Sequence, residues 1–346
     1  MELFDIISDL VTKSGVSGNE TSVGEAVFEH FKKYSGRVWR DPVGNVYAGI
    51  GEGKPVVLIM AHMDEIGMMV TDIEENGMLR ICSVAGVDPR VLPGSKVKVC
   101  GKEPITGVIG AIPPHLLTET EAAYKMEDLT LDTGLPPEKV RELIRVGDFV
   151  TFDPVPPIKL KNGFISGKTL DDRALVAAMT ECMEILNKRR LSCSVVFCAS
   201  VQEESKNIGS ISGAYRIEPD IAIALDVTHG KSPGTEPFDT VDTDKLAVTK
   251  GGNIHPKLYK MLMDACAETN TPAETDVCMG PTGTDAWYMQ VQRGGIPTAV
   301  VSVPLRYMHS TVETLSEKTL HSLARVIAQF VADIDTDLED KLCLDD

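Results

Sequence analysis

Apolar positions along this chain follow two patterns, one typical of buried strands and one typical of helices. Continuous apolar runs predict central strands of a parallel sheet at 56–60, 194–201, 221–227 and 298–305. Apolar residues with helical spacing predict helices at 3–11, 171–190, 256–269 and 283–292, and another ending near Gly36. A last helix is predicted to begin at a capping box formed by Thr314 and Glu317. Strands and helices that alternate in this way indicate an α/β fold with a mostly parallel sheet flanked by helices.

The stretch from residue 67 to 165 interrupts this alternation. It is rich in glycine, proline and short alternating strands, and it shows little helical periodicity. This composition predicts a small β-barrel-like domain inserted into the α/β domain, although long surface excursions are the other interpretation. We therefore expect two domains, one formed by residues 1–66 and 166–346 and the other by the insert 67–165.

Charge and composition exclude several classes of protein. The 346 residues carry a net charge of −17, which argues against nucleic acid or an anionic membrane as a partner. No apolar run is long enough for a transmembrane helix, and the first residues lack a signal-peptide pattern. The eight cysteines form no CxxC pair, which is typical of free thiols in a reducing compartment. We expect a cytoplasmic protein.

Histidines and carboxylates gather where the predicted strands end. The ligand candidates among them are His62, Asp171, Glu204, Asp226 and His309. The carboxyl ends of parallel strands form one edge of a sheet, which is where α/β proteins bind ligands. Imidazole combined with carboxylate is the ligand mixture of Zn²⁺ and similar ions.

Charge balance indicates how many ions such a site would hold. Three carboxylates together with one hydroxide neutralise two divalent ions, an arrangement known in hydrolytic two-metal centres. Glu203 and Asp64 remain beside the ligands. Glu203 is a candidate general base, and Asp64, two residues after His62 on an extended segment, can orient that imidazole.

Six short motifs give the sequence a recognisable pattern. They are AHMDEIG (61–67), GKTLDDRA (167–174), VQEE (201–204), ALDVT (224–228), GTDA (283–286) and RYMHS (306–310). In this order they resemble the tetrahedral (TET) aminopeptidases, dinuclear metallopeptidases also called glutamyl or deblocking aminopeptidases. The resemblance covers nearly the whole chain.

The resemblance implies a role for each candidate residue. It places His62 and Asp226 at one metal, His309 and Glu204 at the other, and Asp171 between them, with Glu203 as general base and Asp64 supporting His62. Asp172, next to Asp171, stays open as an alternative ligand. The resemblance further implies a dinuclear zinc peptidase fold, an inserted dimerisation domain, and dimers that assemble into tetrahedral dodecamers.

These observations together predict a metal-dependent aminopeptidase that acts on peptides with a free N-terminus. It would use a hydroxide that bridges two divalent metal ions. Zinc is the first candidate for these ions, and cobalt and manganese are the others. A glycoside hydrolase using Asp64 and Glu203 is one alternative, disfavoured because only 5% of the residues are aromatic. A non-catalytic scaffold is another, disfavoured because every proposed ligand is present. Contacts of His229, His255 and Arg306 with substrate stay undecided.

Overall fold

The structure is a computed structural model that describes residues 2–116 and 123–344. Its strands are β1 (Arg37–Arg40), β2 (Val46–Ile50), β3 (Val56–His62), β4 (Gly67–Ile73), β5 (Leu79–Val84), β6 (Lys96–Cys100), β7 (Pro104–Ala111), β8 (Leu129–Asp132), β9 (Phe149–Phe152), β10 (Ile158–Lys159), β11 (Phe164–Gly167), β12 (Ser194–Ser200), β13 (Ile221–His229), β14 (Leu246–Gly251), β15 (Ala273–Cys278), β16 (Thr298–Leu305) and β17 (Glu313–Ser316). Its α-helices are α1 (Leu3–Val11), α2 (Thr21–Phe31), α3 (Pro137–Leu143), α4 (Leu170–Leu186), α5 (Glu203–Lys206), α6 (Ile208–Ile217), α7 (Pro256–Glu268), α8 (Ala286–Met289), α9 (Glu317–Ala332) and α10 (Leu338–Leu342).

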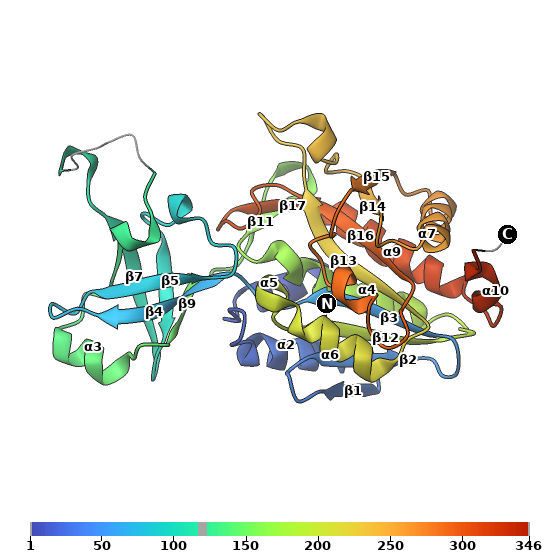
Figure 1. Ribbon diagram of the computed structural model, residues 1–346, viewed down its shortest axis with the longest axis horizontal. Coiled ribbons are helices and arrows are strands. Elements are labelled where there is room, and N and C mark those ends of the chain that lie inside the picture. The colour runs from blue at the N-terminus through green and yellow to red at the C-terminus, as the bar shows by residue number, and fades with distance from the viewer. Residues whose placement is uncertain (1, 117–122, 345–346) are drawn as a thin grey trace.

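The larger domain is built on an eight-stranded sheet in the order β1-β2-β12-β3-β13-β16-β14-β15 (Figure 1). Its centre, β12-β3-β13-β16, is parallel, while β1, β2 and β14 add antiparallel pairings towards the edges. Every residue of β12 is buried, as its continuous apolar run requires of a strand covered on both faces. The prediction of a mostly parallel sheet flanked by helices is confirmed.

Helices cover both faces of this sheet. Helices α1, α2, α4, α7 and α9 pack together on one face, and α6 and α8 pack on the other. Helix α1 shows why the chain folds this way: Leu3, Ile6, Ile7, Leu10 and Val11 recur at helical spacing, and all are buried in the main core.

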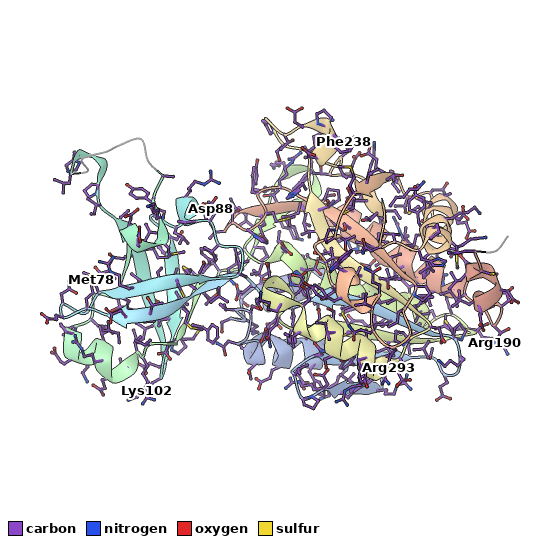
Figure 2. All side chains as sticks on the ribbon, in the orientation of Figure 1. Met78, Asp88, Lys102, Arg190, Phe238 and Arg293 are labelled. Atoms are coloured by element: carbon purple, nitrogen blue, oxygen red, sulfur yellow. The ribbon has the colours of Figure 1, made fainter. Side chains whose placement is uncertain are left out.

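The insert forms a closed barrel of six strands in the order β4-β5-β8-β7-β6-β9, seen on the left of Figure 1. Buried and exposed residues alternate along β7, the period expected of a strand with one face towards a core. The barrel has an apolar core of its own, which includes Met68, Leu79, Val97 and Leu131. Figure 2 shows barrel residues such as Met78 and Lys102 lying far from Arg190 at the opposite end of the molecule.

The end of the predicted insert lies outside the barrel. Strand β10, at Ile158–Lys159, pairs with β11, which in turn pairs with β17 in a separate three-stranded sheet. The barrel strands therefore run from Gly67 to Phe152.

Two of the predicted helix features are wrong. The helix predicted at 283–292 is only the single turn α8. The segment before α8 turns towards the sheet instead, because the buried Asp285 accepts a hydrogen bond from Ser200. The predicted capping box also fails, because Thr314 lies in β17 and its hydroxyl donates to Ser166, while the N-cap of α9 is Ser316.

Candidate active site

Five separate segments bring the predicted site residues to one edge of the sheet. His62 ends β3 and lies opposite Ser200, the last residue of the parallel strand β12. Asp226 lies on the adjacent strand β13, and Asp171 lies at the beginning of α4. Asp64 follows β3, Glu203 and Glu204 follow β12, and His309 lies in the loop after β16, so the predicted convergence at the carboxyl ends of the strands is observed.

Asp171 lies between the two histidines. Its Oδ1 is 3.1 Å from His62 Nε2, and its Oδ2 is 3.5 Å from His309 Nε2. Glu204 Oε1 is in turn 3.3 Å from the same His309 nitrogen. One carboxylate thus offers an oxygen to each imidazole, as a bridging ligand would.

Two overlapping groups of ligand atoms meet at His62. One consists of His62, Asp171 and Glu204, and the other of His62, Asp172 and Asp226. Within the described residues, these are the groups of three or more His, Cys, Asp or Glu whose ligand atoms all lie within 4.8 Å of one another. Imidazole mixed with carboxylate fits a divalent metal of the zinc type. Asp172 enters the second group, so the structure keeps it as a candidate ligand.

The electrostatics of this cluster favour a cation. Burial raises the pKa of Asp226 and Asp172 well above the usual range; nearby carboxylates add to the shift of each, and His62 opposes it. Burial also raises the pKa of Glu203 well above its usual range, although His62 opposes this shift. Hydrogen bonds to Asp171 and Glu204 raise the pKa of His309 to about 11. Buried carboxylates that resist ionisation are stabilised by positive charge, which two metal ions would supply.

Side-chain oxygens hold the backbone that carries Glu203 and Glu204. The N–H groups of Val201 and Gln202 donate to Asn45 Oδ1 and Glu20 Oε1, at 3.0 and 3.1 Å. The next two N–H groups donate to the two oxygens of Asp64, at 3.0 and 3.2 Å. These are the N–H groups that the start of a helix leaves without backbone partners.

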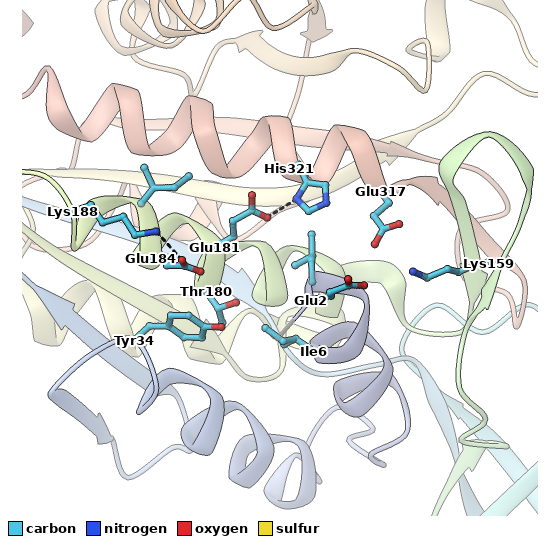
Figure 3. A pocket seen from close by; sticks show the side chains of 12 residues that line it. Glu2, Ile6, Tyr34, Lys159, Thr180, Glu181, Glu184, Lys188, Glu317 and His321 are labelled. Carbon is cyan, nitrogen blue, oxygen red and sulfur yellow. Dashed lines mark hydrogen bonds and ion pairs between the residues drawn. The ribbon is translucent and has the colours of Figure 1, made fainter.

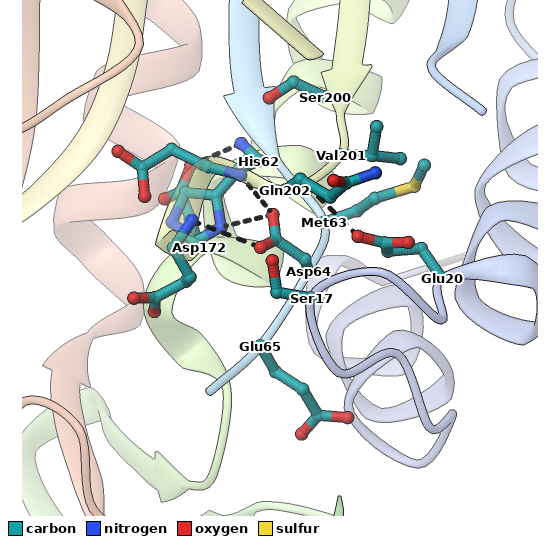
Figure 4. Close-up of polar contacts among 12 residues, drawn as sticks. Ser17, Glu20, His62, Met63, Asp64, Glu65, Asp172, Ser200, Val201 and Gln202 are labelled. Atoms are coloured by element: carbon teal, nitrogen blue, oxygen red, sulfur yellow. Dashed lines mark hydrogen bonds and ion pairs between the residues drawn. The ribbon is translucent and has the colours of Figure 1, made fainter. Parts of the chain in front are cut away.

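Asp64 therefore holds this backbone in addition to facing His62, the role predicted for it. Figure 4 shows its carboxylate between His62 and the segment that contains Val201 and Gln202. Asp64 Oδ1 lies 3.5 Å from His62 Nδ1, so the side chain faces the imidazole as predicted. Because both of its oxygens also accept backbone N–H groups, Asp64 links His62 to the Glu203–Glu204 pair.

Glu313 is a site residue that the sequence analysis missed. It is fully buried on β17, and its two oxygens accept the backbone N–H groups of Asp171 and His309 at 3.1 and 2.9 Å. His309 has φ +60°, a left-handed conformation that is strained for a residue with a side chain. Glu313 thus fixes the backbone of two proposed ligands. A glutamate three residues after the RYMHS motif was the available signal.

The barrel also contributes to this site. The carbonyl oxygen of Gly86, in the insert, lies 3.1 Å from His309 Nδ1. A carbonyl next to Nδ1 keeps that nitrogen protonated and leaves Nε2 free to bind a metal. Metal-binding histidines usually donate their other ring N–H to a carbonyl or carboxylate in this way. The insert therefore orients a proposed ligand of the larger domain.

A cavity of about 330 Å³ opens onto the cluster. Proposed site residues form one wall, and Thr228, His229, Thr282 and Met308 are among the others lining it. The structure places the residues whose contact with substrate was undecided in different surroundings. His229 lines this cavity, whereas His255 is the N-cap of α7 and lines a different cavity. Arg306 donates to the carbonyl oxygen of Lys231 and lies over the ring of Phe164.

A larger cavity, of about 630 Å³, lies against α1 and α4 (Figure 3). Its acidic residues include two that form ion pairs, Glu181 with His321 at 2.6 Å and Glu184 with Lys188 at 2.8 Å. No proposed ligand lines it, so the smaller cavity is the candidate active site.

The fold and the site define the class of a metallohydrolase, with histidine and carboxylate groups gathered at the edge of a mostly parallel sheet. Residues 44–326 match the M42 glutamyl aminopeptidase family, and the chain belongs to that family of metallo-aminopeptidases. The resemblance to TET aminopeptidases is thereby confirmed. In the described part of the chain, no helix combines the length and apolar character needed to cross a membrane.

Individual relatives agree with this assignment. The chain is 33% identical to the lysyl aminopeptidase of Pyrococcus furiosus, over 90% of this chain and 91% of that protein. A TET aminopeptidase from a marine Thaumarchaeota archaeon superposes with a TM-score of 0.93 at 26% identity, covering 99% of both chains. The TET1 peptidase of Pyrococcus horikoshii, described as assembling into a tetrahedron or a large octahedral shell, gives 0.84 at 30% identity, covering 96% of this chain and 100% of that one. A Thermotoga maritima structure named an endoglucanase gives 0.76 at 27% identity, covering 97% of each.

Proposed function

We propose that this protein removes N-terminal residues from peptides with the aid of two divalent metal ions. The observation that carries the proposal is the position of Asp171, whose two oxygens lie 3.1 Å from His62 and 3.5 Å from His309, with Glu203 in the same cavity. Family membership supports aminopeptidase activity. The assignment of residues to roles comes from the resemblance to TET aminopeptidases, and the positions of Asp171, His62 and His309 are consistent with it.

The donor set suggests how the metals would be held. His62 and Asp226 would bind one ion, His309 and Glu204 the other, and Asp171 would contribute to both, consistent with its position between the two imidazoles. Zinc is our first choice, with cobalt and manganese as alternatives, because this mixture of ligands suits all three. Bound divalent ions polarise the scissile carbonyl and lower the pKa of water.

Glu203 is the proposed general base. It lines the cavity beside the proposed ligands, where a carboxylate can accept a proton from water. It would take a proton from the attacking water and pass it to the leaving amine. Asp64 does not line the cavity, and we assign it the task of keeping His62 and Glu203 in place.

The cavity is consistent with action at the end of a peptide. Its carboxylates would attract the α-ammonium group of a free N-terminus, which an N-acetylated peptide lacks. The volume of about 330 Å³ lies at the small end for a ligand site, so it suits a terminal residue better than a continuous chain.

We also propose that the barrel is a dimerisation domain and that dimers assemble further, up to a tetrahedral dodecamer. The support is the assembly described for the TET1 peptidase of P. horikoshii, which covers the same length of chain. The lack of a disulfide among the cysteines of the described residues supports a reducing, cytoplasmic location. Sedimentation of the purified protein tests the assembly: a monomer at micromolar concentration would contradict it.

The geometry argues against the glycosidase alternative. An acid and base pair must both reach the glycosidic bond. Asp64 is fully buried, and both of its oxygens accept backbone N–H groups, so it is not available to a sugar. The endoglucanase name of one related structure therefore does not lead us to assign that activity here.

A panel of aminoacyl-p-nitroanilides tests the proposed function. Metal-stripped protein should be inactive, and added Zn²⁺, Co²⁺ or Mn²⁺ should restore hydrolysis of free but not N-acetylated substrates. Glu203→Gln should abolish turnover with metal content unchanged, whereas Asp171→Asn should lose metal. Near-normal activity of Glu203→Gln would show that Glu203 is not the base, and activity in the stripped protein would refute metal dependence.

A further inference from the structure

Asn207 lies at the junction between α5 and α6 and directs its side chain at Glu203. Its Nδ2 is 2.9 Å from Glu203 Oε1 and 3.4 Å from Asp285 Oδ1. Both neighbours are carboxylate oxygens, which only accept hydrogen bonds, so the NH₂ side of the amide must face them. An NH₂ group carries two hydrogens and can serve both acceptors.

Asp285 anchors this contact from the other side. It is 3% exposed, and Ser200 Oγ donates to its Oδ2 at 2.6 Å. Ser200 ends β12, the strand that leads directly into the Glu203 segment. The Asn207 amide is therefore held between a fixed carboxylate and the Glu203 carboxylate, which has three rotatable side-chain bonds and needs an external contact to stay in one position.

From this geometry, we propose that Asn207 is a positioning residue that holds the Glu203 carboxylate for proton transfer. With Oε1 engaged by the amide, Oε2 is the oxygen that we assign to the water. The inference rests on the proposed function, because it matters for catalysis only if Glu203 is the base. It adds a residue that no motif of the sequence pointed to.

The backbone offers a competing explanation for an asparagine here. Asn207 has φ +52°, and asparagine tolerates this left-handed conformation better than most residues with a side chain. Glycine adopts it without strain. If the backbone were the whole reason, glycine would serve equally well, whereas the proposed side-chain role would be lost.

The experiment uses the full-length, metal-loaded protein with Asn207→Gly, Asn207→Asp and, as a control, Lys206→Ala on the exposed side of the same helix. We expect kcat of Asn207→Gly to fall about 10- to 100-fold, as for other contacts that orient a catalytic group, with KM, metal content and thermal midpoint unchanged. Asn207→Asp keeps the shape but removes the donor, so its kcat should fall at least as far. Lys206→Ala should match the wild type.

Crystal structures of the wild type and Asn207→Gly give a readout that does not depend on activity. We expect the Glu203 carboxylate to be ordered in the wild type and displaced or spread over several rotamers in the variant. A kcat within about twofold of wild type in Asn207→Gly, or an unmoved Glu203 carboxylate, would overturn the inference. If the wild type itself cleaves no peptide, the proposed function fails instead, and the crystal structures still decide whether Asn207 sets the position of Glu203.

Discussion

The buried charges around Glu65 give the most demanding test of how this site is supported. Glu65 follows the end of β3, and its carboxylate forms ion pairs with Lys168 and with Arg173, the latter at 3.2 Å. Its Oε1 also accepts the Gly15 N–H at 2.8 Å and the Thr151 hydroxyl at 3.0 Å. Lys168 and Arg173 flank the Asp171 segment, and Thr151 belongs to the barrel, so Glu65 joins the ligand segment to both domains.

We predict that Glu65→Gln strongly destabilises the protein. The side chains of Lys168 and Arg173 are 3% and 0% exposed, so removing the negative charge leaves two buried cations without their counter-ion. Breaking a buried ion pair from one side costs about 3–5 kcal/mol. The Glu142–Lys139 pair, with side chains 53% and 56% exposed, provides a matched control, because solvent screens an exposed pair and Glu142→Gln should leave the stability close to that of the wild type.

Urea unfolding at pH 7, at one protein concentration, measures both variants against the wild type. The midpoint of Glu65→Gln should fall far below that of Glu142→Gln, and its metal content should drop because the Asp171 segment loosens. Equal midpoints for the two variants, with full metal content in both, would refute the reasoning that the buried pair supports the site.

The stability difference between the wild type and Glu65→Gln should also depend on pH. Burial alone would raise the pKa of Glu65, but Lys168 and Arg173 outweigh burial and lower it. A carboxylate whose pKa is lower in the folded state stabilises the protein above its unfolded pKa, about 4.3, and this contribution is lost as the pH falls through the folded value. The difference in stability between wild type and Glu65→Gln should thus be full at pH 7 and narrow below about pH 4. A gap that widens towards acid would contradict this sign.

Two further predictions concern contacts behind the proposed metal ligands. Glu313→Gln replaces one of two acceptor oxygens with a donor, so zinc affinity should fall about 10- to 100-fold in a competition with a chelator, and an unchanged affinity would remove Glu313 from the site. Gly86→Ala would place a Cβ 2.6 Å from His309 Nδ1 and should displace that imidazole, whereas the control Gly110→Ala meets nothing closer than 4.0 Å. Equal metal content in the two glycine variants would mean that the barrel does not hold His309.

Much of the fold could be predicted because the strands carry strong local signals. The central strands are continuous apolar runs, and the sheet buries them on both faces, so each prediction needed only its own residues. The helix predicted at 283–292 failed for the opposite reason. Its apolar spacing is local, but α8 begins only after Asp285, whose side chain accepts a hydrogen bond from Ser200, 85 positions away in the chain.

The site residues likewise differ in whether the local sequence indicates them. His62, Glu203, Glu204 and Asp226 line the cavity and lie at or near the ends of apolar strands, so the sequence indicates them directly. Glu20 and Glu313 instead act on backbone N–H groups, those of Gln202 and Asp171, which are 182 and 142 positions away. A contact to backbone leaves no pattern of side-chain types at the other end. Such carboxylates therefore look like any other acidic residue until the fold is known.

Asp64 shows why a correct prediction from sequence can still be incomplete. Its spacing from His62 predicts that it faces the imidazole, and it does, but at 3.5 Å from Nδ1. Its shorter contacts are to the N–H groups of Glu203 and Glu204, at 3.0 and 3.2 Å. Hydrogen bonds of that length are stronger than a contact at 3.5 Å, so the main work of Asp64 is to fix the segment that carries the proposed base and a proposed ligand. One buried carboxylate thereby couples the two proposed metal positions through the backbone between them.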